Sequence, residues 1–235
     1  MRHVALALLA ATALSTGTAQ IAFAAPAPPV YNWTGFYIGG YAGYGWGRTT
    51  ARDVGNNNGL PWYILGTEFS AKPNSFIGGA QTGYNFQFNQ FVLGMEADVG
   101  YFRLNGSALY DNTPAHSDTS VVSSGTYAAT VRGRFGYAFD RTLVYVTGGG
   151  FFTNESVQVV SFSTFISPNT SMRSGWTLGG GLEYALSQNW SVKGEYLHYD
   201  LGNTTVTLAG TTSRFDIRSA GDLARVGFNY RFGGR

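Results

Sequence analysis

A strongly alternating stretch lies near the end of the sequence: Arg225-Val226-Gly227-Phe228-Asn229-Tyr230-Arg231-Phe232. Polar or small residues alternate in it with apolar ones, so a strand would turn the two kinds of side chain to opposite faces. The first face carries Arg225, Gly227, Asn229 and Arg231, and the second carries Val226, Phe228, Tyr230 and Phe232. Such alternation, ending in two aromatics, is typical of the closing strand of an outer-membrane barrel. A soluble sheet could show the same pattern, so the rest of the chain has to separate the two.

The first 24 residues have the features of an export signal. Arg2 and His3 form a short basic start, Val4 to Leu14 is a mainly apolar run, and Ala22-Phe23-Ala24 supplies small residues before a cleavage site. We expect the cut after Ala24, because a cut one residue later would place Pro26 next to the scissile bond. The alternative, a membrane anchor, is disfavoured because the run is too short to cross roughly 30 Å of hydrocarbon as a helix.

The composition favours a membrane barrel over a soluble domain. Only 12% of the residues are charged, beside 33 Gly, 17 Phe, 15 Tyr and 5 Trp, whereas soluble domains are about a quarter charged. After residue 24 no apolar run is long enough for a spanning helix. The lack of cysteine excludes disulfides, thiolate zinc clusters and thiol nucleophiles. Cations are spread along the chain without a basic stripe, so no nucleic-acid partner is expected.

Eight segments of the mature chain have the alternation and length of strands. They are Gly35–Gly47, Ser75–Phe86, Phe91–Phe102, Thr126–Phe139, Leu143–Phe152, Gly175–Ala185, Trp190–Tyr199 and Leu223–Phe232. Long connections (about 48–74, 103–125, 153–174 and 200–222) alternate with short ones (87–90, 140–142 and 186–189). The sequence therefore predicts an all-β fold, an eight-stranded antiparallel up-and-down transmembrane β-barrel with short periplasmic turns and four long extracellular loops. Residues 1–24 are then the signal peptide, 25–34 a periplasmic leader and 35–235 the barrel.

The strand period also predicts which charged side chains point into the barrel. In the segment Phe91–Phe102 the large apolar residues occupy one face, which leaves Glu96 and Asp98 on the other. The same reasoning in the other strands predicts an inward set of four acids and five bases: Glu96, Asp98, Glu183, Glu195, Arg132, Arg134, Lys193, Arg225 and Arg231. Near-balanced charges in a narrow interior favour ion pairs that plug it. The alternative is a narrow channel with a charged constriction.

Motifs for catalysis or phosphate binding are weak or absent. The glycine clusters Gly148–Gly150 and Gly179–Gly181 complete no phosphate-binding motif and are expected within strands, where they relieve crowding. His198 precedes Asp200 by two residues, but no nucleophile is defined beside them, and no histidine spacing fits a metal site. We predict that the protein is not an enzyme and has no catalytic residues, metal site or cofactor.

The opening stretch Tyr31–Gly47, the stretch Leu143–Gly149 and the closing strand resemble the alphaproteobacterial family of small outer-membrane β-barrel surface antigens. The resemblance covers essentially the whole mature chain, although the loops are not matched. It implies an eight-stranded barrel of the opacity and outer-membrane-protein-A type, often called porin-like, in the Gram-negative outer membrane. It also implies roles in envelope integrity and surface contact, with haem binding in some relatives. Gly227, Tyr230 and Phe232 resemble the terminal signal read by the barrel-assembly machinery.

Three functions remain open from the sequence. The leading prediction is a structural, surface-interacting barrel whose partners are outer-membrane lipid, the assembly machinery and a host or surface ligand at the long loops. The first alternative is a small porin-like diffusion channel. The second is loop-mediated binding of haem or another small ligand, for which His116 is the plausible ligand, with Tyr63 and Tyr110 as weaker substitutes.

Overall fold

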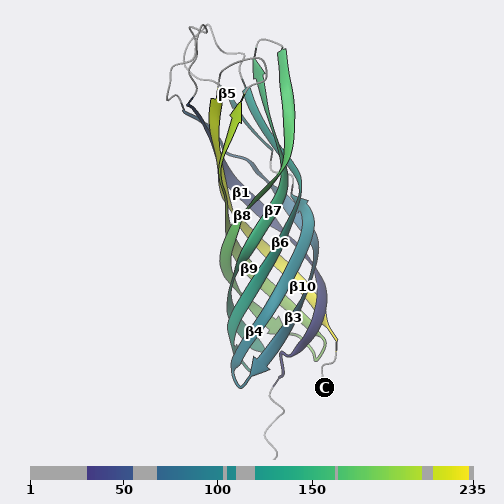
Figure 1. Ribbon diagram of the computed structural model, residues 1–235. Coiled ribbons are helices and arrows are strands. Elements are labelled where there is room, and N and C mark those ends of the chain that lie inside the picture. Colours follow the sequence, from purple (N-terminus) through teal and green to yellow (C-terminus); the bar gives the residue numbers. More distant parts are fainter. Residues whose placement is uncertain are drawn as a thin grey trace, which may run out of the picture. The chain divides into compact units, whose positions relative to one another are not determined.

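In the computed structural model, residues 31–54, 68–102, 105–109, 120–161, 164–207 and 214–232 are described. They form one antiparallel sheet of ten strands (Figure 1). The strands are β1 (Gly35–Asp53), β2 (Glu68–Ala71), β3 (Asn74–Phe88), β4 (Phe91–Phe102), β5 (Asn105–Leu109), β6 (Ser120–Phe139), β7 (Thr142–Ser161), β8 (Thr164–Ala185), β9 (Trp190–Thr207) and β10 (Arg214–Arg231). The predicted signal peptide and its cleavage site lie outside these residues and stay predictions.

The sheet closes on itself because β1 pairs with both β10 and β3. Eight long strands form the ring in the order β1, β3, β4, β6, β7, β8, β9, β10, and each pairs antiparallel with its neighbours. The predicted eight-stranded up-and-down barrel is therefore confirmed. Closure leaves no strand edge unpaired in the membrane, which a spanning sheet requires. Among the described residues there is no helix long and apolar enough to cross a membrane.

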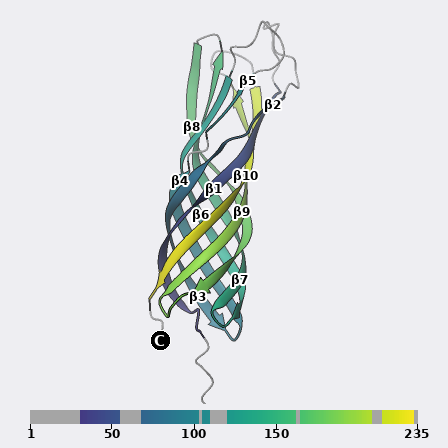
Figure 2. The same ribbon diagram turned by 180° about the vertical axis from the view of Figure 1, so that it is seen from behind.

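Short turns and both ends of the described barrel chain meet at one end of the barrel (Figures 1 and 2). The backbone N–H of Tyr31 donates to Asp140 in the β6–β7 turn, and that of Arg231 donates to the carbonyl oxygen of Asn189 in the β8–β9 turn. Asn89 and Asp140 adopt left-handed backbone angles (φ 52° and 51°), a conformation that Asn and Asp tolerate well. By the usual orientation of such barrels this turn end is periplasmic.

The strands run further toward the opposite end than the sequence predicts. β8 begins at Thr164 instead of Gly175, β9 continues to Thr207 instead of ending at Tyr199, and β10 begins at Arg214 instead of Leu223. In addition, β2 and β5 form within segments predicted as loops. The reason is that backbone pairing continues beyond the membrane, where no lipid imposes an apolar outer face. The alternation from which strands are predicted is lost there, although the hydrogen bonding is not.

The outer wall of the barrel is apolar and carries two aromatic belts. The belt near the turns contains Phe36, Phe88, Phe91, Tyr137, Phe139, Tyr184, Trp190, Tyr230 and Phe232, and the distant belt contains Tyr44, Trp46, Tyr101, Tyr127, Trp176 and Tyr196. Exposed aliphatic side chains such as Met95, Val131 and Leu178 lie between the belts. So many exposed large apolar groups would be a liability in water, and they match the lipid-facing band and girdles of an outer-membrane barrel.

Inside the wall, tyrosines pack over glycines of neighbouring strands. A Cβ added to Gly83 would clash with the hydroxyl of Tyr37, and one added to Gly100 would clash with that of Tyr41. A Cβ on Gly181, within the second glycine cluster, would lie 2.7 Å from Tyr145 Oη. These glycines make room for large side chains in a narrow interior. Both glycine clusters lie within strands, β7 and β8.

Arginine substitutions on the wall test this assignment of lipid-facing positions. Val131, midway between the belts, and Leu186, in the periplasmic β8–β9 turn, are equally exposed, at 51% each. We expect Val131→Arg to lower the free energy of unfolding in lipid by about 2–4 kcal/mol, because the charge would sit near the bilayer midplane. The matched control Leu186→Arg should cost less than about 1 kcal/mol. Equal losses in urea titrations of the two variants would contradict the membrane placement.

Candidate functional site

The interior of the barrel is the candidate functional site, since the predicted inward charges gather there. All nine of the predicted inward ionisable residues are buried: Glu96, Asp98, Glu183, Glu195, Arg132, Arg134, Lys193, Arg225 and Arg231. They are contributed by β4, β6, β8, β9 and β10. Eight of them, all except Arg231, join one set of ion pairs, which we call the ionic layer. Its four acids and four bases balance.

Arg132 of β6 is shared by three carboxylates. Its Nη2 atom donates to Glu96 Oε1 and lies 2.9 Å from Asp98 Oδ2, and its Nη1 atom lies 3.2 Å from Glu195 Oε1. Glu96 is the register partner of Arg132 on the adjacent strand β4, whereas Glu195 belongs to β9, which is not adjacent to β6. The Arg132 side chain is entirely withdrawn from solvent. A guanidinium in this position supplies several donors in fixed directions and can hold several carboxylates together.

Two further cations connect opposite sides of the interior. Lys193 Nζ of β9 donates to both carboxylate oxygens of Glu96 in β4, at 2.8 and 2.7 Å. Arg225 of β10 pairs with Glu195 on its neighbour β9 and reaches Asp98 Oδ2 of β4 at 3.0 Å. Neither β9 nor β10 is adjacent to β4 in the ring. These bonds therefore cross the lumen instead of following the wall.

The principal partner of Arg134 is an acid on a strand that is not adjacent to its own strand β6. Its Nη2 atom lies 2.8 Å from Glu183 Oε2 of β8, while its Nη1 atom is 3.7 Å from the β4 acid Glu96. Glu183 also accepts hydrogen bonds from Ser191 and Asn229. The order of strands along the chain does not indicate this contact, because β8 is not adjacent to β6 and only the closed ring brings the two side chains together.

Arg231 is buried but lies outside the ionic layer. Its guanidinium carbon is 4.3 Å from the centre of the Tyr31 ring, and its Nη2 atom donates to the carbonyl oxygen of Gln188 at 2.8 Å. No acid among the described residues is within ion-pair distance of it. Arg231 is the last residue of β10, so it lies nearer the turns than the four acids. A cation–π contact takes the place of an ion pair there.

Sequence reasoning missed the residues that complete the polar contacts. The Tyr37 hydroxyl donates to Glu96 Oε2 at 2.8 Å and accepts from Arg134 at 3.0 Å. The Tyr145 hydroxyl donates to Glu195 Oε1 at 2.9 Å. Tyr37 belongs to β1, where Phe36 and Ile38 on either side of it are exposed. The alternation of that strand could have predicted that Tyr37 points into the barrel.

Two clusters of buried apolar residues lie on either side of the ionic layer. The outer cluster, toward the long connections, consists of Ile77, Phe102, Ala128, Phe151, Leu197, Tyr199, Leu201 and Leu223. In it the rings of Phe151 and Tyr199 stack with centroids 4.7 Å apart, and Phe102 packs edge-on against both. The mouth cluster, at the turns, consists of Tyr31, Trp33, Val92, Ala138, Leu143, Tyr145 and Ala185.

Two aromatic residues of the predicted leader belong to the mouth cluster. Trp33 is 1% exposed and donates through Nε1 to the carbonyl oxygen of Asp140 at 3.1 Å. Its backbone N–H donates to Gln87 Oε1 at 2.6 Å, and its ring packs edge-on against Tyr31. Residues 31–34 therefore lie in the periplasmic mouth. The sequence signal was the pair of aromatics spaced two apart immediately before the first strand.

The other candidate residues lie apart from this interior. His198 is on the outer wall with Nδ1 2.9 Å from Asp222 Oδ1, while Asp200 pairs instead with Arg218 at 2.9 Å. The described residues contain no group of three His, Cys, Asp or Glu side chains that could hold a metal ion. The predicted haem ligand His116 and its substitutes Tyr63 and Tyr110 lie outside the described residues.

The predicted assembly-signal aromatics lie on the lipid-facing wall at the turn end. The rings of Tyr230 and Phe232 pack edge-on with centroids 5.0 Å apart, and Phe232 also contacts Phe36. Gly227 is buried on the inward face.

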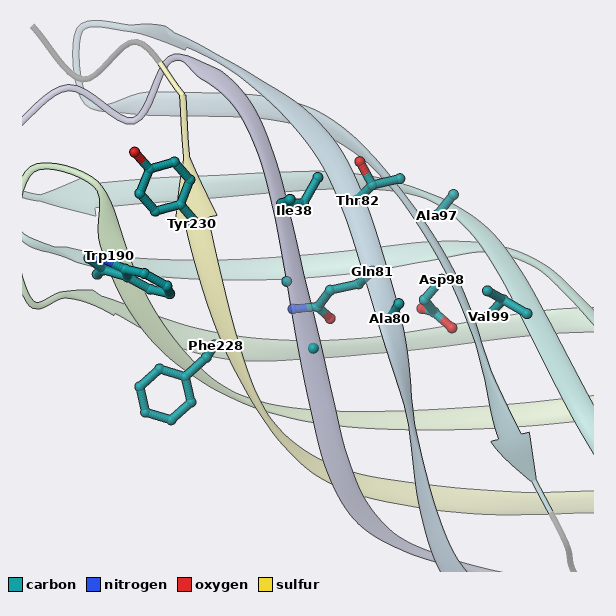
Figure 3. A pocket seen from close by; sticks show the side chains of 12 residues that line it. Ile38, Ala80, Gln81, Thr82, Ala97, Asp98, Val99, Trp190, Phe228 and Tyr230 are labelled. Atoms are coloured by element: carbon teal, nitrogen blue, oxygen red, sulfur yellow. The ribbon is translucent and has the colours of Figure 1, made fainter.

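Tyr230 also lines a shallow wall groove of about 680 Å³ beside Trp190 and Phe228, and small outward residues form its floor (Figure 3). The floor residues are Gly40, Ala80 and Ala97.

The closed antiparallel ring, the apolar wall with two aromatic belts and the polar interior define an integral outer-membrane β-barrel protein. A family model described as outer membrane protein beta-barrel domain matches residues 6–232. The chain belongs to this family, and it is a protein of the Gram-negative outer membrane.

Two relatives confirm the resemblance to alphaproteobacterial surface antigens. The 25 kDa outer-membrane immunogenic protein of Brucella abortus is 32% identical over 232 residues, which cover 97% of this chain and 94% of the relative. The 31 kDa outer-membrane immunogenic protein of Brucella melitensis is 33% identical over 250 residues, which cover 99% of this chain and all of the relative. The crystal structure of the outer membrane protein OprG from Pseudomonas aeruginosa shares the fold, with a TM-score of 0.60 at 13% identity over 86% of this chain and 97% of that chain.

Removing one cation of the ionic layer tests its contribution to stability. We expect Arg132→Ala to lower the free energy of unfolding by about 3–5 kcal/mol, because three buried carboxylates lose a shared partner. The control Arg231→Ala removes a buried arginine outside the layer and should cost about 1–2 kcal/mol, the order of a cation–π contact and one hydrogen bond. Equilibrium unfolding in lipid or detergent measures both. Similar losses would mean that the ion pairs add nothing beyond ordinary packing.

Proposed function

We propose that this outer-membrane protein is a closed structural barrel with a surface-interaction role, not a diffusion channel and not an enzyme. Two cation–carboxylate contacts that cross the lumen, Lys193 with Glu96 and Arg225 with Asp98, are the main support for a closed barrel. Apolar clusters lie on both sides of these contacts. An ion entering the lumen would have to displace stacked aromatics and then compete with paired charges. Eight strands leave little interior space for an alternative path.

The relatives' names support the interaction part of this proposal. Both Brucella relatives are named as outer-membrane immunogenic proteins, a property that requires exposure to the immune system of a host. In this chain β7 and β8 are 20 and 22 residues long, whereas a strand needs about 9–11 residues to cross the membrane. The part of the hairpin beyond the outer aromatic belt offers a surface for contact with a host or another external ligand. The proposed partners are such a ligand and outer-membrane lipid.

Conductance in planar bilayers tests whether the barrel is closed. We expect low or flickering currents from the wild-type protein, and higher conductance or lower stability from Arg132→Ala and Arg134→Ala, which leave carboxylates unpaired in the lumen. Arg231→Ala, which leaves the ionic layer intact, serves as the control for conductance. Large and steady single-channel currents from the unmodified protein would overturn the closed-barrel proposal and favour the porin-like alternative.

Cysteine labelling tests the orientation on which the surface role depends. The natural sequence contains no cysteine, so single substitutions report their own position only. Met172, four residues beyond the outer-belt residue Trp176 in β8, is 82% exposed, and Leu186 in the opposite turn is 51% exposed. We expect Met172→Cys to react with a membrane-impermeant maleimide on intact cells, and Leu186→Cys to react only after permeabilisation. The reverse pattern would place the long connections in the periplasm.

A further inference from the structure

A groove on the outer wall lies where β1, β9, β10, the start of β3 and the β2–β3 connection meet the outer aromatic belt. Its volume is about 370 Å³, and the residues that matter for its chemistry are Trp46, Arg48, Lys72, Asn74, His198 and Asp222. We call it the rim groove. The strands that form it are neighbours in the ring, because β1 pairs with β10 and β10 pairs with β9 (Figure 2). From this arrangement we infer that the rim groove binds the phosphate group of a lipid in the outer leaflet.

The position of the groove matches the headgroup level of the membrane. Trp46 belongs to the outer belt, where its ring lies 6.2 Å from that of Tyr196 and 6.3 Å from that of Tyr44. Such aromatic belts mark the boundary between hydrocarbon and headgroups. Arg48 follows Trp46 by two residues on the same face of β1, so it lies roughly 7 Å further along the tilted strand, on the side away from the hydrocarbon. Its guanidinium therefore lies at the depth of lipid phosphates.

The two cations at the groove have no acidic partner. Arg48 and Lys72 are exposed, and within the described part of the chain no carboxylate lies within ion-pair distance of either. Arg48 is opposite Ala220 in the pairing with β10. Further along the same face, Arg52 has Asp216 and Glu68 as its register partners. Unlike Arg52, Arg48 has no acid at the paired position, so its charge is available to a ligand.

The one acid in the groove is already engaged. Asp222 Oδ1 lies 2.9 Å from His198 Nδ1 and accepts a hydrogen bond from the Tyr196 hydroxyl at 2.8 Å. Asn74 accepts a bond from the Tyr44 hydroxyl at 2.9 Å, which leaves its amide N–H groups as donors at the groove. The groove thus combines two unpaired cations with neutral donors. That combination is suited to a phosphate.

The wall below the groove identifies the source of the phosphate as a lipid. Trp46, Tyr44 and Tyr196 are exposed on the lipid side of the groove, so a molecule that holds its phosphate at Arg48 and Lys72 would lay its acyl chains against these rings. A soluble anion would gain nothing from this apolar surface. Basic residues beside the hydrocarbon boundary attract anionic headgroups, and each one strengthens binding about fivefold.

Native mass spectrometry of the detergent-solubilised barrel, titrated with lipid A and with the same lipid after dephosphorylation, tests the inference. The wild-type protein should bind the phosphorylated form more tightly. Arg48→Ala and Lys72→Ala should each weaken that binding about fivefold, and the double variant roughly thirtyfold. None of these changes should alter binding of the dephosphorylated lipid. Millimolar inorganic phosphate should leave the lipid bound.

Matched controls separate a specific site from general electrostatics. The variant Arg52→Ala/Arg141→Ala removes the same number of exposed charges, one beyond the groove on β1 and one in the periplasmic β6–β7 turn, and it should bind within twofold of wild type. Arg48→Lys should retain most of the binding. Equal weakening by the control pair, or displacement of the lipid by inorganic phosphate, would overturn the lipid site. Gel mobility before and after heating confirms that each variant is folded before it is titrated.

Discussion

The contact between Lys193 and Glu96 across the lumen is the interaction on which the interior depends. Lys193 Nζ lies within 2.8 Å of both Glu96 oxygens, and the two residues come from strands that are not neighbours in the ring. Both side chains are withdrawn from water, at 0% and 2% exposed. A lone buried charge would be strongly destabilising, so each of these groups requires buried partners of opposite sign. Through Glu96 the contact extends to Arg132 and Tyr37. The ionic layer is therefore a single unit rather than a set of separate pairs.

The barrel inverts the usual arrangement of a soluble domain. Large apolar side chains such as Met95 and Leu178 cover the outside, and charges fill the middle of the inside. The apolar side chains can face outward because they contact lipid. The charged side chains can lie inside because the wall keeps water away from their ion pairs. The glycines on the inner face are explained by the narrowness of the lumen. Glycines opposite Tyr37 and Tyr41 let rings occupy a lumen that eight strands make narrow.

The sequence predicts the wall well and the interior only in part. Period-two alternation places Val226, Phe228 and Phe232 outward and Arg225 and Asn229 inward, as the structure has them. Contacts between adjacent strands, such as Arg132 with Glu96, also follow from the order of the chain. Contacts across the lumen do not, because they depend on the tilt and stagger with which the ring closes. For that reason the Arg134–Glu183 pair and the separate position of Arg231 could not be predicted. Strand ends beyond the outer belt were missed because alternation fades where lipid no longer selects one face.

A double-mutant cycle on Glu96 and Lys193 measures whether charges bonded across the lumen stabilise the barrel as one unit. The measurement is the free energy of unfolding in lipid for the wild type, Glu96→Gln, Lys193→Met and the double variant. We expect the loss of unfolding free energy in the double variant to be smaller than the sum of the single losses by about 1–3 kcal/mol, the range found for directly interacting residues. Strictly additive losses would show that the two charges do not stabilise each other and that the ionic layer is not a single unit.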